Sequence, residues 1–505
     1  MKIPYKEPTL YRIRSLNRFY TYKVLLFAVL SLGIILRARQ YLFNRSLWLD
    51  EASLAWNIVS KSYLELLGIL EYGQAAPIGF LFVERFFFQL FGDTEYVLRL
   101  FPFLSGVLSL FFFHKLIRYR FSKEGTLIAV FLFAISTSLI HFSSELKQYS
   151  SDVAIALILI LGAFHLGHHK LTPTRAVLFG LAGGMALCLS HPALFVLGGI
   201  GLTLATISFL QKDFHALRSL LIMFAMWMTA FMALYFLSYG HISRQEGLMT
   251  YWHASFMPFP PTSLSDLLWF PNKLLEMFQK LLQIRFIEAA LPIFLVGVFS
   301  LVLTDKKLLF FLLSPLLLAL MASSLHKYPF EGRLLLFAIP ALLFCLAKGI
   351  ETLSLGSTWL RLMLVLLIGY QPLMTAVKHF QSPRRFPRAH EEIKPLMQYM
   401  QHKQKGGDLI RFPYRTQPAF RYYAPRYGFT KQEDAITHTS GATWDDFLSG
   451  LSRLPRQGRV WILLTHPYPG QGRALMAHMN TIGTRLLVRS TPGALLVLYD
   501  LTKYY

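Results

Sequence analysis

Two adjacent carboxylates, Asp50 and Glu51, directly follow Trp48-Leu49, a few residues after the first long apolar segment of the chain. A carboxylate held close to a membrane is costly and is often functional. Acidic residues also favour the first turn of a helix, where they cap free N–H groups. The pair therefore predicts either a functional acidic site or a helix cap, and Glu51 can be structural even if Asp50 is not.

A second polar cluster, residues 141–152, lies between two apolar segments. Glu145, Tyr149 and Asp152 follow one another at intervals of four and three residues, so one helical face would present all three. Lys147 and Gln148 would lie on an adjacent face. The alternative is a solvated helix start, but so dense a polar run between two apolar segments favours a functional site.

A third polar cluster, residues 326–333, carries Lys327, Glu331 and Arg333. Arg333 opens an apolar run and is therefore expected at the level of the lipid headgroups. There its guanidinium group either reaches a lipid phosphate, which is the ordinary role of such a residue, or binds the phosphate of a lipid-linked substrate. The sequence leaves both interpretations open.

The composition places these clusters in a membrane protein. Of the 505 residues, 54% are hydrophobic and only 15% are charged, whereas soluble domains carry about 25% charged residues. A helix needs about 20 residues to cross the hydrocarbon layer. The predicted spans are 22–41, 97–115, 124–140, 151–167, 175–190, 193–210, 219–239, 286–304, 308–324, 334–349 and 359–377. His191-Pro192 separates either two short spans or the halves of one broken helix, so we predict ten or eleven spans.

The Lys and Arg residues of the short loops predict the orientation of the spans. They gather in the N-terminal segment and in alternate loops, for example at Lys115, Arg118, Lys306 and Lys307. We therefore expect this side, with the N-terminus, to face the cytoplasm. Eleven spans then place the C-terminus and the loops 42–96 and 240–285 on the extracytoplasmic side.

Two domains are predicted, a transmembrane domain over 1–378 and a soluble extracytoplasmic domain over 379–505. In the second domain, strand-like runs at 408–412, 459–465 and 494–500 alternate with helical patterns at 443–451 and 472–480. This order is typical of a small α/β domain. His466 follows the second strand, where a histidine is sometimes catalytic and more often structural.

Several functions are disfavoured by the sequence. The net charge of +23 is explained largely by loop residues that set topology and meet anionic lipid, so we expect membrane lipid and no nucleic acid as a partner. Both cysteines, Cys188 and Cys345, fall inside spans, and neither a disulfide framework nor a cysteine metal site is implied. The sequence has no Walker loop, dinucleotide fingerprint or HExxH motif, which argues against an ATP-driven pump.

Four motifs resemble those of GT-C superfamily glycosyltransferases. Trp48-Leu49-Asp50-Glu51 is similar to their acidic motif, and Gln74-Ala75-Ala76-Pro77 to the start of their second interfacial helix. Residues 91–102 resemble the entry to their second span. Residues 144–152 look like those of bacterial family 39 enzymes, relatives of protein O-mannosyltransferases and of lipid A aminoarabinose transferases. The resemblance is strong over about 20–160 and mostly topological from there to about 350.

The resemblance implies a GT-C-like polytopic enzyme of the bacterial inner membrane. Such enzymes move a sugar from a polyprenyl-phosphate donor to a lipid, glycan or protein acceptor at the outer face. Asp50 matches the proposed base of the family, and Glu51 is its catalytic companion. The candidates for binding the phosphate and the sugar of the donor are Gln74, Arg99, Glu145, Lys147, Gln148, Tyr149, Asp152, Lys327 and Arg333. Metal dependence varies within the superfamily, so the resemblance implies no particular cofactor and leaves a divalent metal ion open.

Two other function classes remain. A lipid or glycan transporter would need charges at the middle of the membrane, whereas the predicted charges gather at the outer rim, which favours the enzyme. A non-catalytic protein of envelope-glycan assembly would tolerate the loss of Asp50. The sequence identifies neither the sugar nor the acceptor.

Overall fold

The computed structural model describes residues 9–167, 171–240, 250–382, 391–429 and 443–502. These residues form two compact units. The helical unit comprises Met1–Leu42, Ala76–Glu84 and Arg99–Phe380, and the α/β unit comprises Phe43–Ala75, Arg85–Leu98 and Gln381–Tyr505. Most of the first predicted outer loop therefore belongs to the same unit as the C-terminal segment.

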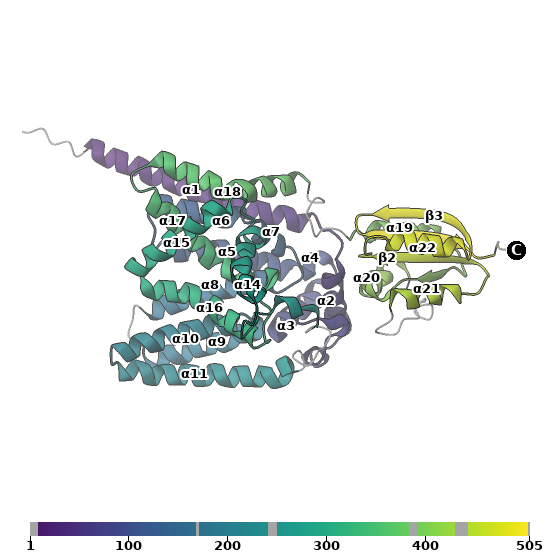
Figure 1. The fold of residues 1–505 in the computed structure, drawn as a ribbon, viewed down its shortest axis with the longest axis horizontal. Coiled ribbons are helices and arrows are strands. Elements are labelled where there is room, and N and C mark those ends of the chain that lie inside the picture. The colour runs from purple at the N-terminus through teal and green to yellow at the C-terminus, as the bar shows by residue number, and fades with distance from the viewer. Residues whose placement is uncertain (1–8, 168–170, 241–249, 383–390, 430–442, 503–505) are drawn as a thin grey trace, which may run out of the picture. The chain divides into compact units, whose positions relative to one another are not determined.

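The helical unit is built from long helices that run roughly parallel to one another (Figure 1). The long helices are α1 (Thr9–Leu42), α5 (Leu100–Ile117), α6 (Lys123–Ile135), α8 (Tyr149–Leu166), α9 (Pro173–Leu189), α10 (Ala193–Leu210), α11 (Phe214–Leu234), α15 (Ile287–Thr304), α16 (Lys306–Ser324), α17 (Ile339–Leu353) and α18 (Thr358–Gln381). The unit also contains the short helix α7 (Thr137–Phe142) and α14 (Leu264–Glu276), which runs across the long helices in Figure 1. Short 3-10 or π segments adjoin them at Tyr235–Tyr239, His253–Ser255, Met277–Leu281 and Gly332–Ala338. Helix α3 (Ile78–Phe91) lies partly in each unit.

Among the described residues, nine helical segments are long and apolar enough to cross a membrane. The shorter helix α9 has 17 residues, and α6 ends at Ile135, where Ser136 separates it from α7. Each predicted span overlaps one of these helices, and two separate helices, α9 and α10, flank His191-Pro192. The predicted polytopic helical fold is confirmed. Part of the predicted outer loop 240–285, residues 241–249, lies outside the described residues.

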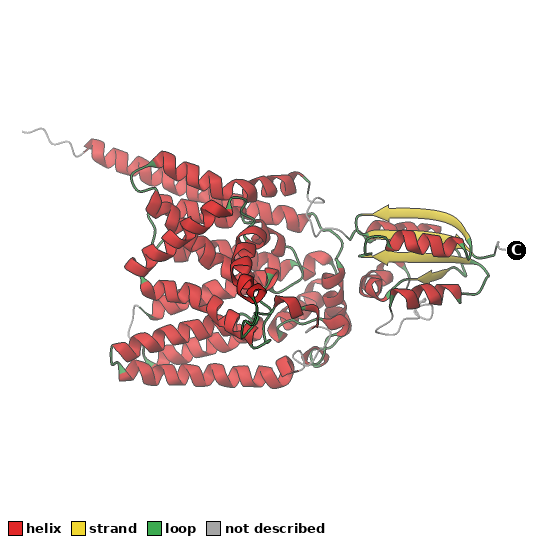
Figure 2. Ribbon diagram, viewed as in Figure 1, coloured by secondary structure: helices red, strands yellow, loops and turns green. Residues whose placement is uncertain are grey.

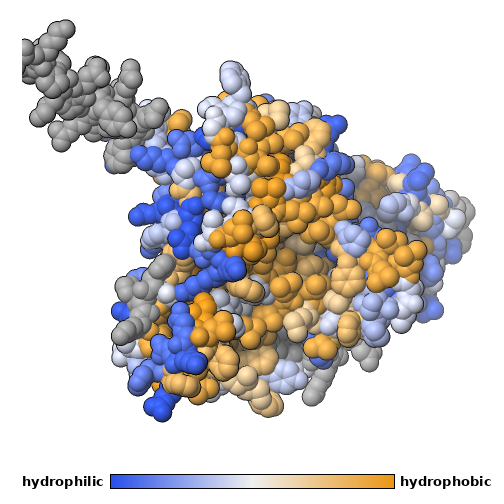
Figure 3. Space-filling model, turned by 60° about the vertical axis from the view of Figure 1, so that its left-hand side comes forward, coloured by the Kyte–Doolittle hydropathy of each residue, from blue (hydrophilic) through white to orange (hydrophobic). Residues whose placement is uncertain are grey.

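Apolar side chains cover a broad face of the protein surface (Figure 3). Phe27, Phe310 and Leu366 are 74%, 58% and 64% exposed, for example. Soluble monomers rarely expose an apolar surface of such extent, and helices α1, α16 and α18 carry these three residues. We therefore interpret this surface as the lipid-facing surface of an integral membrane protein.

Loops at one end of the helical bundle are linked by basic residues. Arg120, after α5, forms an ion pair of 2.5 Å with Asp305 at the start of α16. Lys307 donates a hydrogen bond of 2.7 Å to the carbonyl oxygen of Gly167 at the end of α8. Loops that the charge pattern assigned to one side of the membrane therefore lie at one end of the bundle.

The α/β unit combines residues of the first outer loop with the C-terminal segment. Its helices are α2 (Leu49–Ser60), α4 (Glu95–Leu98), α19 (Lys394–Lys403), α20 (Gln417–Tyr423), α21 (Trp444–Ser452) and α22 (Gln471–Asn480). Short 3-10 segments occur at Glu65–Leu67, Glu71–Gly73, Tyr414–Thr416 and Ala424–Tyr427. Figure 2 shows that, among the described residues, the strands are confined to the C-terminal segment.

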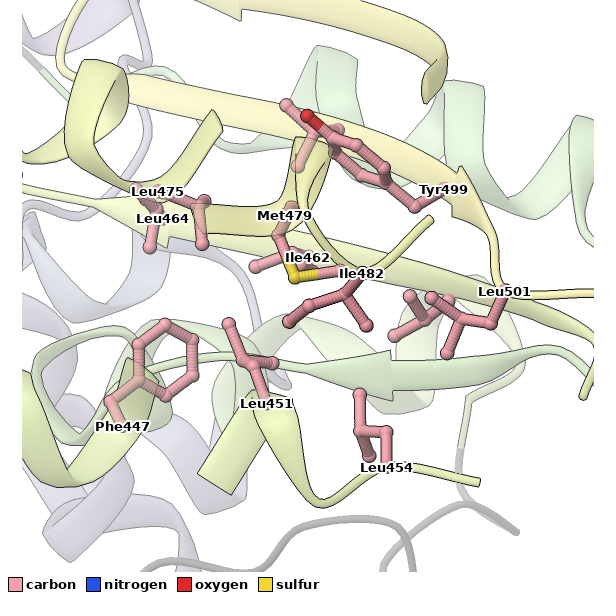
Figure 4. Packing of buried hydrophobic residues seen from close by; sticks show 12 residues of the cluster. Phe447, Leu451, Leu454, Ile462, Leu464, Leu475, Met479, Ile482, Tyr499 and Leu501 are labelled. Carbon is pink, nitrogen blue, oxygen red and sulfur yellow. The ribbon is translucent and has the colours of Figure 1, made fainter. Parts of the chain in front are cut away.

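The four strands form one sheet in the order β1-β2-β4-β3. Strand β1 (Leu409–Arg411) pairs in parallel with β2 (Arg459–Thr465), and β4 (Ala494–Asp500) pairs antiparallel with both β2 and β3 (Thr484–Thr491). Apolar side chains of β2 and β4 pack against α21 and α22 to form the core shown in Figure 4. Strand β2 ends at Thr465, and His466 is the first residue of the loop that follows it.

The predicted α/β pattern of the C-terminal segment agrees with the structure at three strands and two helices. Thr443 caps α21 as expected, because its hydroxyl accepts the N–H of Asp446. Strand β3 and the helices α19 and α20 were not predicted. Most side chains of the edge strand β3 are exposed, so its sequence lacks the alternation of apolar and polar residues that marks a half-buried strand.

A buried carboxylate holds the sheet and provides a stability prediction. Asp408 accepts hydrogen bonds from Trp461 at 2.8 Å and from Arg459 at 2.5 and 2.8 Å. Burial opposes its ionisation, but the charge and hydrogen bonds of Arg459, together with those from the backbone N–H of Lys405 and from Trp461, outweigh that effect and lower the pKa of Asp408. We expect Asp408→Ala to destabilise the sheet by about 2 kcal/mol or more, because it leaves the buried indole N–H without its acceptor.

Hydrogen exchange of the full-length protein measures this effect through the protection of the β2 amides. In the wild type, the contribution of Asp408 is present above the ordinary carboxyl pKa and is lost as the pH falls through its lowered folded pKa. Asp445→Asn, at an exposed position of α21, is the matched control. Unchanged β2 protection in Asp408→Ala would contradict the assignment.

Candidate functional site

Glu51 lies in the first turn of α2 and is fully buried. Its Oε2 lies 3.8 Å from a guanidinium nitrogen of Arg45 and accepts the backbone N–H of Trp48 at 3.5 Å. These contacts fix the start of the helix, as acidic residues at a helix N-terminus commonly do. The geometry around Glu51 is therefore that of a structural residue.

Asp50, one residue earlier in the same turn, is partly exposed. The two carboxylates of the acidic motif thus occupy different environments, although they are adjacent in the sequence. A carboxylate that is to exchange a proton with a substrate must be accessible. Of the two residues, Asp50 meets this requirement.

Two residues of the C-terminal segment lie against the acidic motif. The carboxylate of Glu391 accepts the backbone N–H of Leu49 and interacts electrostatically with Asp50. Its Oε1 lies 2.6 Å from Nδ1 of His466, the histidine that follows β2. The sequence indicates His466 as a candidate but gives little signal for Glu391, which stands in a pair of adjacent acids after a basic stretch.

Electrostatics couple this pair to Asp50. The hydrogen bond that His466 donates to Glu391 raises the pKa of His466, and Asp50 contributes to the rise while Arg415 opposes it. Burial raises the pKa of Glu391, and His466 opposes that rise. The imidazole therefore holds its proton to a higher pH than an isolated histidine would.

A second set of contacts anchors the first outer loop within the α/β unit. The N–H of Leu47 donates to the hydroxyl of Tyr423 at 2.9 Å, and that hydroxyl donates to Glu95 at 2.9 Å. Lys394 and Arg426 each lie 3.2 Å from Glu95. Burial opposes the ionisation of Glu95, but these cations and the tyrosine outweigh it and lower its pKa. The buried, charged network makes the loop part of the folded unit.

Gln74 is also buried in this unit, and its amide nitrogen donates to the carbonyl oxygen of Tyr72 at 3.2 Å. Tyr72 has a positive φ of 57°, so the turn that carries Gln74 is sharply bent. The structure thus places Gln74 at a defined turn before α3, and its role toward a donor stays a prediction.

The polar cluster 141–152 belongs to the helical unit and is buried. Glu145 and Lys147 are 0% and 4% exposed, and Gln148 is 5% exposed, so the alternative of a solvated helix start is wrong. Glu145 pairs with Nε2 of His141 at 2.9 Å. It does not share a helical face with Tyr149 and Asp152, as had been expected, because α8 begins only at Tyr149 and residues 143–148 form turns.

Residues from two predicted clusters come together around the start of α8. The guanidinium carbon of Arg333 lies 5.6 Å from the ring centroid of Tyr149. Asp152 interacts electrostatically with Ser190, and Tyr328 interacts electrostatically with both Asp152 and Tyr149. The clusters 141–152 and 326–333 therefore contribute to one polar region within the helical unit.

The remaining predicted residues differ in exposure. Arg99 is 1% exposed at the start of α5, whereas Lys327 is exposed. Within the described part of the chain, no group of three or more His, Cys, Asp or Glu side chains is placed to hold a metal ion. Arg45, Ser190, Tyr328 and Tyr423 also contact these groups, although their local sequence patterns do not mark them as site residues.

Glu84 of α3 is a buried acid with an expected effect on stability. It is 0% exposed, and neither carboxyl oxygen has a hydrogen-bond partner among the described residues. Burial raises the pKa of Glu84 well above its usual range. The folded state therefore keeps a proton that the unfolded chain releases above about pH 4.3, so this residue lowers stability as the pH rises toward its folded pKa.

We expect Glu84→Gln to raise the free energy of unfolding at pH 8 by about 1 kcal/mol or more and to change little at pH 4. Thermal unfolding of the detergent-solubilised protein at both pH values measures the difference. The control is Glu65→Gln, at an exposed position. A Glu84→Gln protein that is less stable than the wild type at pH 8 would contradict this prediction.

The sequence matches one known protein family over part of its length. The family model for dolichyl-phosphate-mannose-protein mannosyltransferase matches residues 75–233. A comparison with curated proteins finds no sequence match. Residues 75–233 include the start of α3 and the whole buried cluster 141–152.

Solved structures share the fold. ArnT from Cupriavidus metallidurans bound to undecaprenyl phosphate matches with a TM-score of 0.55 and 11% identity, over 96% of this chain and 98% of that chain. The Archaeoglobus fulgidus oligosaccharyltransferase in complex with Zn and sulfate matches with a TM-score of 0.52 and 12% identity, over 93% of this chain and 72% of that chain. The chain has the fold of the GT-C membrane glycosyltransferases. This fold and the family match over residues 75–233 together support the predicted superfamily and a transferase function, and they leave the donor, the sugar and the site residues open.

Proposed function

We propose that this protein moves a sugar from a polyprenyl-phosphate donor to a lipid, glycan or protein acceptor at the extracytoplasmic face of the bacterial inner membrane. The observation that carries the proposal is the contrast within the acidic motif. Glu51 is buried and ion-paired with Arg45, whereas Asp50 is partly exposed in the same helical turn. Asp50 is therefore assigned the role of general base.

In the proposed reaction, one bond to C1 of the sugar forms and another bond to C1 breaks. A hydroxyl oxygen of the acceptor attacks C1 of the sugar, and the bond from C1 to the phosphate oxygen breaks. The electron pair of that bond goes to the phosphate, which leaves as polyprenyl phosphate. The hydroxyl proton goes to the carboxylate of Asp50 and from there to solvent. A positioned general base of this kind contributes about 10²–10⁴-fold to the rate.

The leaving phosphate needs positive charge that is fixed before the reaction. Lys147 is assigned this role because it is 4% exposed in a polar turn. Arg333 is a second candidate, since it lies over the ring of Tyr149. Asp152, Gln148, Glu145, Gln74, Arg99 and Lys327 stay in the proposal as residues that orient these groups or bind the sugar.

The proposed donor class is supported by what related structures hold. ArnT from Cupriavidus metallidurans was solved with undecaprenyl phosphate, and the oligosaccharyltransferase AglB from Archaeoglobus fulgidus was solved with an inhibitory peptide and a dolichol-phosphate. AglB matches with a TM-score of 0.50 and 10% identity, over 94% of this chain and 74% of that chain. Both lipids are polyprenyl phosphates. The family model that matches residues 75–233 also describes an enzyme with a lipid-phosphate sugar donor.

The proposed orientation is supported by the basic end of the helical bundle. Arg120 and Lys307 lie at that end, and an excess of basic residues in short loops favours the cytoplasmic side. We place the opposite end, with the loops that precede α8 and follow α16, at the extracytoplasmic surface.

A transfer assay tests the proposed function. Purified protein in liposomes is given undecaprenyl phosphate or dolichyl phosphate carrying radiolabelled mannose, glucose or arabinose, with extracted envelope lipids and glycans as acceptors. The proposal predicts that label from one donor moves to an acceptor and that free polyprenyl phosphate appears in equal amount. Label that crosses the bilayer while still attached to its lipid would instead indicate a transporter.

A further inference from the structure

His466 and Glu391 form a pair that the proposed reaction does not yet use. The side chain of His466 is 44% exposed and that of Glu391 only 3%, and their ring nitrogen and carboxylate oxygen lie 2.6 Å apart. His466 has a positive φ of 50°, which is uncommon for a residue other than glycine. Its backbone N–H donates to the carbonyl oxygen of Gly493 at 2.9 Å, so the turn after β2 fixes the position of the imidazole.

Glu391 connects this imidazole to the acidic motif. It accepts the backbone N–H of Leu49, the residue that precedes Asp50. The next acid, Glu392, accepts a hydrogen bond of 3.0 Å from the hydroxyl of Ser46. The segment before α19 therefore forms two hydrogen bonds with residues at the start of α2. One of the two acceptors, Glu391, also contacts His466.

We propose that His466 is a positioning residue for Asp50, acting through Glu391 to hold the first turn of α2 and to neutralise the second carboxylate beside the base. This inference rests on the proposed function, since it assigns a role relative to Asp50 as general base. It gives the C-terminal domain a part in the reaction that neither the acidic motif nor the family match assigns.

The charges around the imidazole support this role. Glu391 and Asp50 face it with negative charge, and Arg415, from the 3-10 segment Tyr414–Thr416, faces it with positive charge. A buried carboxylate without its cation is strongly unfavourable. If His466 loses its proton, Glu391 must take up a proton or move away from its place, and either change alters the charge or the position of the turn that carries Asp50.

A pH dependence follows. Because the hydrogen bond to Glu391 raises the pKa of His466, the imidazole is protonated below that raised value and neutral above it. The positioning effect is therefore complete at acidic to neutral pH and is lost as the pH rises through the folded pKa of His466. We expect the turnover number kcat to fall on the alkaline side, with little change in the KM of the donor.

Three variants test the proposal on the full-length protein, with the donor that the transfer assay identifies. His466→Gln removes the charge and keeps a hydrogen-bond donor, and we expect kcat to fall on the order of tenfold or more and the alkaline decline to disappear. Glu391→Gln removes the charge that requires neutralisation and keeps an acceptor for the N–H of Leu49, so the alkaline decline should also disappear. In the double variant the loss should be smaller than the product of the two single losses, because the two residues act as one unit.

The matched control is His402→Gln, an exposed histidine of α19 in the same unit, and the melting temperature of each variant reports folding. A folded His466→Gln protein with the wild-type kcat and the wild-type pH profile would overturn the proposal. If His466→Gln does not fold, the pH profile of Glu391→Gln decides, and an unchanged alkaline decline there would overturn it too. Loss of the proposed function is distinguishable, because then the wild type itself would turn over no donor.

Discussion

Replacing Asp50 with asparagine is expected to lower kcat by about 10²–10⁴-fold, the usual contribution of a positioned general base. The amide has the size of the carboxylate but does not accept a proton, so donor binding should persist while transfer stops. The measurement is the initial rate of polyprenyl phosphate release at saturating donor and acceptor, together with the affinity for the donor.

The control for this variant is Asp445→Asn, which removes an exposed acid from the first turn of another helix, α21, in the same unit. It should keep the wild-type rate. Glu51→Gln is expected to act differently from Asp50→Asn, since Glu51 is buried against Arg45, and its main effect should be a lower melting temperature. Full activity of a folded Asp50→Asn protein would exclude Asp50 as the base.

Replacing Lys147 with methionine is expected to weaken donor binding by about 10- to 100-fold, because a charge-assisted hydrogen bond contributes about 1.5–3 kcal/mol. Methionine keeps the apolar stem of Lys147, a residue that is 4% exposed in the wild type, and removes its ammonium group. The dissociation constant for undecaprenyl phosphate, measured by isothermal titration in detergent, reports the loss without requiring a known sugar.

Lys147→Arg, which keeps the charge, should recover part of this affinity. Lys306→Met removes an exposed lysine from the start of α16 and should leave the affinity unchanged. Equal affinities of the wild type and a folded Lys147→Met protein would show that the phosphate is bound elsewhere, and Arg333 would be examined next by the same titration.

Much of the fold could be predicted because its signals are local. A span such as 193–210 is long and apolar enough to be recognised alone, and α10 has the same bounds. The central strands β2 and β4 were recognised from apolar runs that end at turn residues. Strand β3 was missed because it lies at an edge and carries mostly exposed side chains, so no periodic pattern marks it.

The candidate site was less predictable because it depends on contacts between distant segments. The sequence identified Asp50 and His466 separately, and nothing in their local patterns indicates that one folded unit brings them together. The link between Leu47 and Tyr423 joins residues 376 positions apart. The environments of Glu51 and Glu145 are also visible only in the structure. Residue spacing does not show that Glu51 is buried against Arg45, or that α8 begins at Tyr149, after Glu145.

The most direct test of the proposed transferase is whether purified protein converts a polyprenyl-phosphate sugar to free polyprenyl phosphate only when Asp50 is intact. Mass spectrometry of the lipid fraction after incubation with the donor panel and envelope acceptors measures this conversion. We predict that the wild type and Asp445→Asn release polyprenyl phosphate and that Asp50→Asn does not. If folded wild-type protein releases no polyprenyl phosphate with any donor and acceptor, the proposed function is contradicted. If Asp50→Asn releases as much as the wild type, the assignment of Asp50 as the base is contradicted.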